Sequence, residues 1–135
     1  MDMQDFVNAM NVRDSLERGN YHLTIGYLEK LLRLNPRAVV QWEDGKGADY
    51  IDSYRGYYTD CAISDAPTPQ SASGMLERIE HLKAEGMEGY KGGHYAVSDR
   101  TPLWRSEYGD ADNVAVISAD VADGVITLRT EKIEQ

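Results

Sequence analysis

The sequence predicts an α+β fold in which an antiparallel sheet of about five strands carries two or three helices on one face. Three observations lead to this prediction. The chain has 135 residues, a length typical of a single domain with its own hydrophobic core. Apolar residues recur at helical spacing in several segments before residue 86, whereas beyond residue 90 they fall in short β-type runs separated by turn residues. Segregated helices and strands are typical of the α+β class.

The first helix is expected over residues 3–18. It lies in an N-terminal extension, 1–20, that precedes an α+β core of residues 23–131 within one domain. Gly19 and Asn20 tolerate the left-handed backbone conformation with which helices end, so the helix is predicted to stop there. Its apolar residues have the spacing i, i+3, i+4, i+7 and are Met3, Phe6, Val7 and Met10.

Two further helices are expected in the core. One begins after Thr24, whose side chain can cap it, and ends before Pro36, which lacks an N–H group. The other covers 71–85 and ends at Gly86. The residues predicted to face the core are Tyr27, Leu28, Leu31, Leu32 and Leu34 in the first, and Met75, Leu76, Ile79 and Leu82 in the second.

Strands are expected where β-branched and aromatic residues cluster or alternate. The alternation of Tyr57, Thr59, Cys61 and Ile63 is typical of a half-buried strand. Asp123 and Gly124 are predicted to turn the chain between the last two strands, in a connection that is looser than a two-residue hairpin. The expected strands cover residues 38–42, 57–63, 90–97, 102–105, 113–118 and 124–129.

The composition limits the possible partners and the compartment. A net charge of −9 argues against direct binding to nucleic acid, which needs a surplus of Lys and Arg. The same charge permits an acidic surface that imitates DNA, although simple solubility is the alternative explanation. Cys61 is the single cysteine, so no intramolecular disulfide forms. Because the N-terminus is acidic and no apolar run reaches ~20 residues, the sequence predicts neither a signal peptide nor a membrane span. We therefore expect a cytosolic protein.

Two short runs share one chemistry, a cation and glycines set among aromatic rings. Rings can stack on a planar ligand, the cation can bind an anionic group, and glycine lets a ligand approach backbone N–H groups. This combination suits a nucleotide-like small molecule. The predicted ligand-binding residues are Tyr54, Arg55, Gly56 and Tyr57 in the first run, Tyr90, Lys91, Gly92, Gly93, His94 and Tyr95 in the second, and Arg105 outside both.

This pocket requires the two runs to converge, within one chain or across a homo-oligomer. Trp104 and its neighbour Arg105 point to opposite faces of their strand, so we expect Trp104 in the core and Arg105 as a spare cation of the pocket. The alternative is that the tyrosines pack as ordinary strand residues, that Arg55 pairs with a nearby aspartate, and that the glycines form bulges.

The sequence predicts neither a catalytic residue nor a metal or cofactor site. His22 lies in a connector, His81 on the solvent side of a predicted helix, and His94 in the second aromatic run. These histidines lack the i, i+4 pairing and the companion cysteines that mark zinc sites. Cys61 is expected to be a small buried hydrophobic residue rather than a nucleophile. We therefore expect a protein that binds rather than catalyses.

Several segments occur in a recognisable order: Leu23-Thr24-Ile25-Gly26-Tyr27-Leu28, then Ser53-Tyr54-Arg55-Gly56-Tyr57-Tyr58, then Tyr90-Lys91-Gly92-Gly93-His94-Tyr95 running through Thr101-Pro102-Leu103-Trp104 to Tyr108-Gly109. In this order they resemble small uncharacterised proteins that tailed phages and prophages encode. The resemblance covers residues 23 to about 118. It implies a phage gene that acts in the cytosol of the host bacterium, and it supplies no activity and no functional residues.

Two functions are compatible with these observations. In a phage context, a nucleotide pocket without catalytic residues suggests a counter-defence protein that sequesters a nucleotide-type signal. The alternative is an inhibitor of a host defence or DNA-binding protein, working through the acidic surface or through the apolar stripe of the helix over 3–18. That stripe can equally be a homodimer contact or part of the core. A virion accessory protein is a third possibility.

Overall fold

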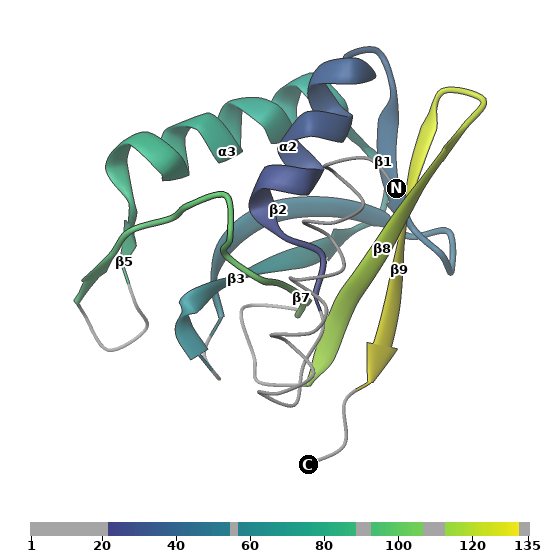
Figure 1. Cartoon of the computed structure of the whole chain (residues 1–135). Helices are drawn as coiled ribbons and strands as arrows, with labels where there is room; N and C mark the ends of the chain where they lie inside the picture. The colour runs from purple at the N-terminus through teal and green to yellow at the C-terminus, as the bar shows by residue number, and fades with distance from the viewer. Residues whose placement is uncertain (1–21, 55–56, 89–92, 107–112, 133–135) are drawn as a thin grey trace, which may run out of the picture.

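The computed structural model describes residues 22–54, 57–88, 93–106 and 113–132. In this part of the chain two helices lie next to each other on one side of a strongly bent sheet (Figure 1). The predicted helix over 3–18 lies outside the described residues.

Helix α2 spans Ile25–Leu34 and begins where the sequence predicts it. The Thr24 side chain accepts a hydrogen bond from the Tyr27 backbone N–H at 3.4 Å, which caps the first turn. Leu28 and Leu32 are fully buried, as expected. Leu34 is 68% exposed, so its assignment to the core is wrong. It lies two residues after Leu32, which is roughly 200° round the helix and therefore on the opposite face.

Helix α3 spans Ala72–Glu85, close to the predicted 71–85. Ser71 caps its start by accepting a hydrogen bond from Gly74 N–H at 3.1 Å. Gly86 ends it with a positive φ of 76°. The face with Met75, Ile79 and Leu82 is buried, and this confirms the predicted periodicity.

Nine strands are present in the described residues. Seven form one sheet in the order β2-β3-β7-β8-β9-β1-β4, and β5 pairs only with β6. The pairs β3–β7 and β9–β1 are parallel, so the sheet is mixed and larger than the predicted antiparallel sheet of about five strands, whereas the α+β class is confirmed. The strands are β1 Val39–Trp42, β2 Gly47–Tyr54, β3 Tyr57–Ala66, β4 Gln70–Ser71, β5 Met87–Glu88, β6 His94–Tyr95, β7 Leu103–Arg105, β8 Val114–Ala122 and β9 Val125–Lys132.

An additional pairing closes the sheet on itself. β1 pairs with β9 on one side and, at Gln41 and Gly47, with β2 at the far end of the sheet order. The connecting hairpin is tight, since Trp42 N–H donates to the Lys46 carbonyl at 2.7 Å. A side chain at Gly47 would put its Cβ 2.0 Å from the carbonyl oxygen of Thr68, in the connection between β3 and β4, so only glycine fits at the start of β2. The sheet therefore curls into a barrel-like ring.

The last hairpin differs from its prediction. β8 continues through Ala122 and β9 starts at Val125, so the connection is a two-residue turn rather than a loose one. Both turn residues have positive φ, 51° at Asp123 and 75° at Gly124, as the hairpin turns that match strand twist require. Ser118 pairs with Arg129 within this ladder. Residues 118–122 thus form a mostly exposed end of a strand.

Each face of the sheet has its own buried cluster. The main core includes the buried faces of α2 and α3 together with inward residues such as Trp42, Ile51 and Leu103. The second cluster contains no helix residue among those described, and it consists of Tyr54, Ala62, Trp104 and Ala115. Both described helices therefore belong to one face, as predicted.

Candidate functional site

The structure describes about half of the residues predicted to bind a ligand. Tyr57 begins β3, where it pairs with Tyr54 of β2. The others in the described part are Gly93, His94, Tyr95 and Arg105. The remaining five lie outside the described residues and are Arg55, Gly56, Tyr90, Lys91 and Gly92.

Tyr54 is fully buried in the second cluster, where its ring packs against other residues of the protein. Its ring stacks on Trp104 with centroids 4.4 Å apart and an interplanar angle of 5°. The Tyr54 hydroxyl accepts a hydrogen bond from Asn113 N–H at 3.0 Å. Trp104 in turn donates from Nε1 to Asp60 at 2.9 Å and contacts the His22 ring at a centroid distance of 4.1 Å. The predicted core position of Trp104 is confirmed.

Arg105 lies on the other face of β7, as the alternation predicted, but it is not a spare cation. Its Nε and one terminal nitrogen each donate to Asp65 at 2.8 Å, and the same terminal nitrogen donates to Asp44 at 2.8 Å. The guanidinium lies 4.6 Å from the ring centroid of Trp42. Burial opposes its charge, but the hydrogen bonds to Asp65 and Asp44 outweigh that effect and raise the pKa of Arg105. Arg105 thus closes one end of the curled sheet.

The small hairpin of β5 and β6 brings three of the predicted residues together. Glu88 pairs with His94, and Gly93, immediately before β6, has a φ of 94°. Tyr95 is half-buried and packs against the main core, whereas His94 is exposed. A Cβ on Gly86 would lie 2.6 Å from Nε2 of His94, so the imidazole rests against the residue that ends α3. Of the predicted strand over 90–97, only His94–Tyr95 is a strand within the described part.

In the described part of the chain, the exposed side of α3 carries unpaired carboxylates. The one lysine and the one arginine of α3 both donate hydrogen bonds to other groups of the protein. Lys83 donates to Glu29 at 2.7 Å and to Asp99 at 2.6 Å, and Arg78 donates to the Ile51 carbonyl at 2.9 Å. Two exposed carboxylates of α3, Glu77 and Glu85, form no ion pair with any described residue. We call these two residues the acidic face.

An exposed aromatic ring lies beside this face. Tyr50 on β2 is 52% exposed, and the guanidinium carbon of Arg78 lies 4.1 Å from its ring centroid. Its backbone is fixed by Ser64, whose hydroxyl accepts from Tyr50 N–H at 3.2 Å and donates to its carbonyl at 3.3 Å. Sequence patterns did not predict this contact, because β2 was not predicted as a strand.

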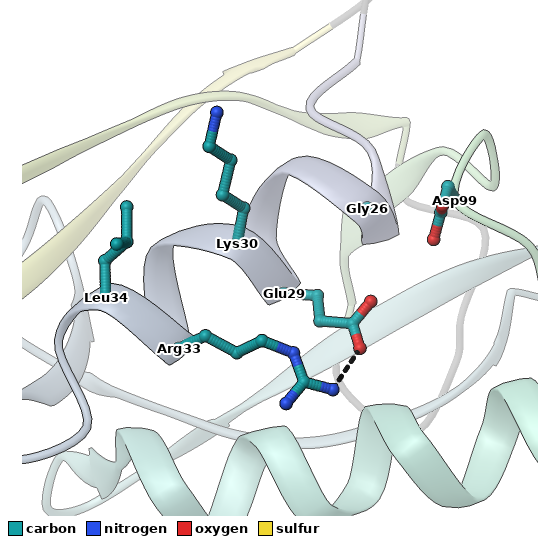
Figure 2. Close-up of a pocket in the computed structure, with 6 residues that line it drawn as sticks. All are labelled: Gly26, Glu29, Lys30, Arg33, Leu34 and Asp99. Atoms are coloured by element: carbon teal, nitrogen blue, oxygen red, sulfur yellow. Dashed lines mark hydrogen bonds and ion pairs between the residues drawn. The ribbon is translucent and has the colours of Figure 1, made fainter.

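A shallow depression of about 340 Å³ lies along α2 (Figure 2). Arg33 and Glu29 turn toward each other and form an ion pair of 2.9 Å, while Lys30 and Leu34 point away from that pair. Burial raises the pKa of Glu29, but hydrogen bonds from Lys83 and Arg33 outweigh it and hold that pKa below its ordinary value. The lining residues are Gly26, Glu29, Lys30, Arg33, Leu34 and Asp99.

The start of α2 offers no place for an anion in this depression. Ile25 N–H donates to the Thr101 carbonyl and Gly26 N–H to the Asp99 carbonyl, both at 2.9 Å. The next N–H group, that of Tyr27, is taken by the Thr24 cap. A free helix N-terminus attracts anions, whereas these N–H groups already have partners. From the sequence, only the helical periodicity of residues 25–34 could have predicted that Lys30 and Leu34 lie on the outer surface of the helix.

The remaining candidates for chemistry are structural in the described part. His22 is buried and hydrogen-bonds the Leu103 carbonyl oxygen at 2.7 Å, and His81 is exposed on α3. Cys61 is fully buried 3.8 Å from the Met87 sulfur, and burial raises the pKa of its thiol to about 12, which confirms the predicted small hydrophobic residue. The described residues contain no group of three or more His, Cys, Asp and Glu able to hold a metal ion.

Within the same described residues, no helix is long and apolar enough to cross a membrane. In comparisons with protein-family models, with curated proteins and with solved structures, the chain matches none of them.

Proposed function

We propose that the protein is a phage-encoded, non-enzymatic binding protein that acts in the host bacterial cytosol and inhibits a host defence or DNA-binding protein through its acidic face. The observation that carries this proposal is which charged side chains of α3 are bound within the protein and which face the solvent. Lys83 and Arg78 are held by groups of the protein, while Glu77 and Glu85 face the solvent without an ion pair to any described residue. Such a surface is complementary to a basic partner.

The rest of the molecule agrees with a partner that is a basic protein. The chain has a net charge of −9, which repels polyanions and accelerates encounter with cations. Tyr54 and Arg105, two members of the predicted nucleotide pocket, are occupied by Trp104 and by Asp65. The phage context comes from the sequence resemblance, and the proposal takes the bacterial cytosol from it.

The test is displacement of DNA from purified host DNA-binding proteins, followed by the fluorescence anisotropy of a labelled duplex. Wild type is expected to release the duplex from its target, and Glu77→Gln with Glu85→Gln should release much less. The matched control is Asp123→Asn with Glu131→Gln, which removes the same charge from the exposed β8–β9 hairpin. Equal losses in both double variants would reduce the effect to net charge and contradict a specific acidic face.

Sequestration of a nucleotide-type signal is the second candidate. It is supported by the β5–β6 hairpin, where Gly93, His94 and Tyr95 lie together at the end of the second aromatic run. Its test is mass spectrometry of small molecules released on denaturing protein purified from defence-active cells. An intact cyclic or ADP-ribose-type nucleotide would favour sequestration, a cleaved product would indicate an enzyme, and an empty spectrum would favour the protein inhibitor.

A further inference from the structure

We propose that His81 regulates the acidic face, so that a basic partner binds more weakly as the pH falls from about 8 to about 5.5. This inference rests on the proposed function, because it concerns the same two carboxylates, Glu77 and Glu85. His81 lies between them on α3, four residues after the first and four before the second, and all three side chains are exposed. The acidic face therefore has a titratable group at its centre.

The helical spacing brings the imidazole next to both carboxylates. Residues four apart on a helix are separated by about 6 Å along its axis and lie on nearly the same face. A protonated His81 can therefore form an ion pair with Glu77 or with Glu85, whereas a neutral imidazole cannot. Protonation lowers the negative charge of this area by one unit and occupies a carboxylate that would otherwise bind the partner.

The other charged groups of α3 near His81 are bound within the protein. Arg78, three residues before His81, donates to a backbone carbonyl and lies over the ring of Tyr50. Glu80 and Lys83 are one and two residues from His81, and residues so close in sequence do not face each other on a helix. Glu80 pairs with Arg33 at 3.0 Å, and Lys83 pairs with Glu29 and Asp99.

The elements that pack against α3 lie on its buried side. That side carries Met75, Ile79 and Leu82, and His81 is two residues beyond Ile79, which is roughly 200° round the helix. The packed elements are α2, β2 and β4, and β4 has no charged residue. Their charged or titratable residues are Tyr27, Glu29, Lys30 and Arg33 on α2, and Asp49, Tyr50 and Asp52 on β2. The carboxylates of the acidic face are thus the charged groups that the spacing sets beside His81.

The direction of the effect follows from the linkage between binding and protonation. A cation held over Glu77 and Glu85 repels a protonated imidazole, so the complex binds fewer protons than the free protein in the range where histidine changes its charge. Binding therefore releases protons, and the affinity falls as the pH falls. Lysine and arginine side chains of the partner keep their charge throughout this range, so they do not contribute to the change.

The test uses a fluorescently labelled oligolysine peptide as the basic probe and measures its binding to the full chain by anisotropy at low salt. Wild type should bind it about fivefold more weakly at a pH of about 5.5 than at about 8. His81→Gln cannot gain the charge, so it should lose most of this change and stay near the tighter value. His81→Lys carries the charge permanently and should stay near the weaker value. The matched control is Asp123→Asn, which changes the net charge of the chain by the same unit in a distant turn and should keep the wild-type pH dependence.

Equal pH dependence in wild type and His81→Gln would overturn the regulation, and so would a wild-type protein that does not bind the peptide. Thermal unfolding of each variant checks that α3 remains folded. The regulation and the proposed function fail separately. If DNA displacement needs Glu77 and Glu85 but His81→Gln keeps the full pH dependence, only the regulation is lost. If peptide binding changes with pH through His81 but no DNA is displaced from any host protein, the regulation stands and the proposed inhibition is lost.

Discussion

Arg105 binds Asp65 through two parallel hydrogen bonds, each 2.8 Å long, across 40 residues of sequence. Both side chains are mostly buried, with 16% and 13% of their surface exposed. The pair connects β7 to β3, and Arg105 also covers the ring of Trp42. A residue that resembled a spare ligand-binding cation is therefore a fixed part of the wall of the curled sheet.

Replacing Arg105 by alanine should lower the free energy of unfolding by about 2 kcal/mol or more, because Asp65 would keep a poorly solvated charge without its partner. Urea denaturation measures this change. Arg129→Ala, which breaks an ion pair with Asp120 whose two side chains are each 56% exposed, should have little effect. An Arg105 variant with unchanged stability would return this residue to the list of ligand-binding candidates.

Gly47→Ala should force apart the start of β2, which pairs with β1, and the connection between β3 and β4. The new Cβ would lie 2.0 Å from the Thr68 carbonyl oxygen and 2.3 Å from its carbonyl carbon, and backbone atoms cannot move aside cheaply. We expect a loss of about 3 kcal/mol of stability. Gly124→Asn is the comparison, because its site is open and asparagine tolerates the φ of 75° found there. Near-equal melting temperatures for the two variants would disagree with the closed sheet.

Glu29 should make the protein sensitive to acid. Its pKa in the folded state lies below the ordinary 4.5, since hydrogen bonds from Lys83 and Arg33 outweigh the effect of burial. The unfolded chain therefore takes up this proton at a higher pH than the folded chain does, so the stability that Glu29 contributes is present above about 4.5 and disappears as the pH falls through the lower, folded value. Urea midpoints measured from neutral to acidic pH should fall less steeply in Glu29→Gln. If the urea midpoints of wild type and Glu29→Gln fall equally steeply with pH, then Lys83 and Arg33 do not stabilise the Glu29 carboxylate.

Cys61 should be unreactive in the folded protein. Burial raises the pKa of its thiol from 9.0 to about 12, so almost no thiolate exists at pH 8, and the sulfur is shielded from solvent. Native protein mixed with a thiol-specific chromogenic reagent should therefore show no rapid colour change, while urea-unfolded protein should react with its one thiol. Fast labelling without denaturant would mean that the face of β3 toward Met87 opens readily.

The helices were predictable because their signals are local. Thr24 and Gly86 mark a start and an end by their own chemistry, and apolar spacing of three and four residues identifies the buried faces. β2 was missed because Gly47–Tyr54 begins with glycine and contains two aspartates, so that it reads as a turn. The closure of the sheet was missed for another reason. It depends on the parallel pairing of β9 with β1, and no local pattern records which distant strands meet.

The site was less predictable than the fold. Composition alone identified rings and cations that suit a nucleotide, but it could not show that Tyr54 stacks on Trp104 or that Arg105 meets Asp44, which is 61 residues away. The acidic face is likewise a product of the fold. It appears only once the cations of α3 are seen to bind Glu29, Asp99 and a backbone carbonyl.

The most direct measurement compares two double variants in the assay for release of a labelled DNA duplex from its host protein. Glu77→Gln with Glu85→Gln alters the acidic face, and Arg55→Ala with Lys91→Ala removes the cations of the two aromatic runs. Our account predicts that the first pair abolishes most of the inhibition and that the second leaves it near the wild-type level. Loss of inhibition in the Arg55 and Lys91 variant, with full inhibition in the Glu77 and Glu85 variant, would contradict it.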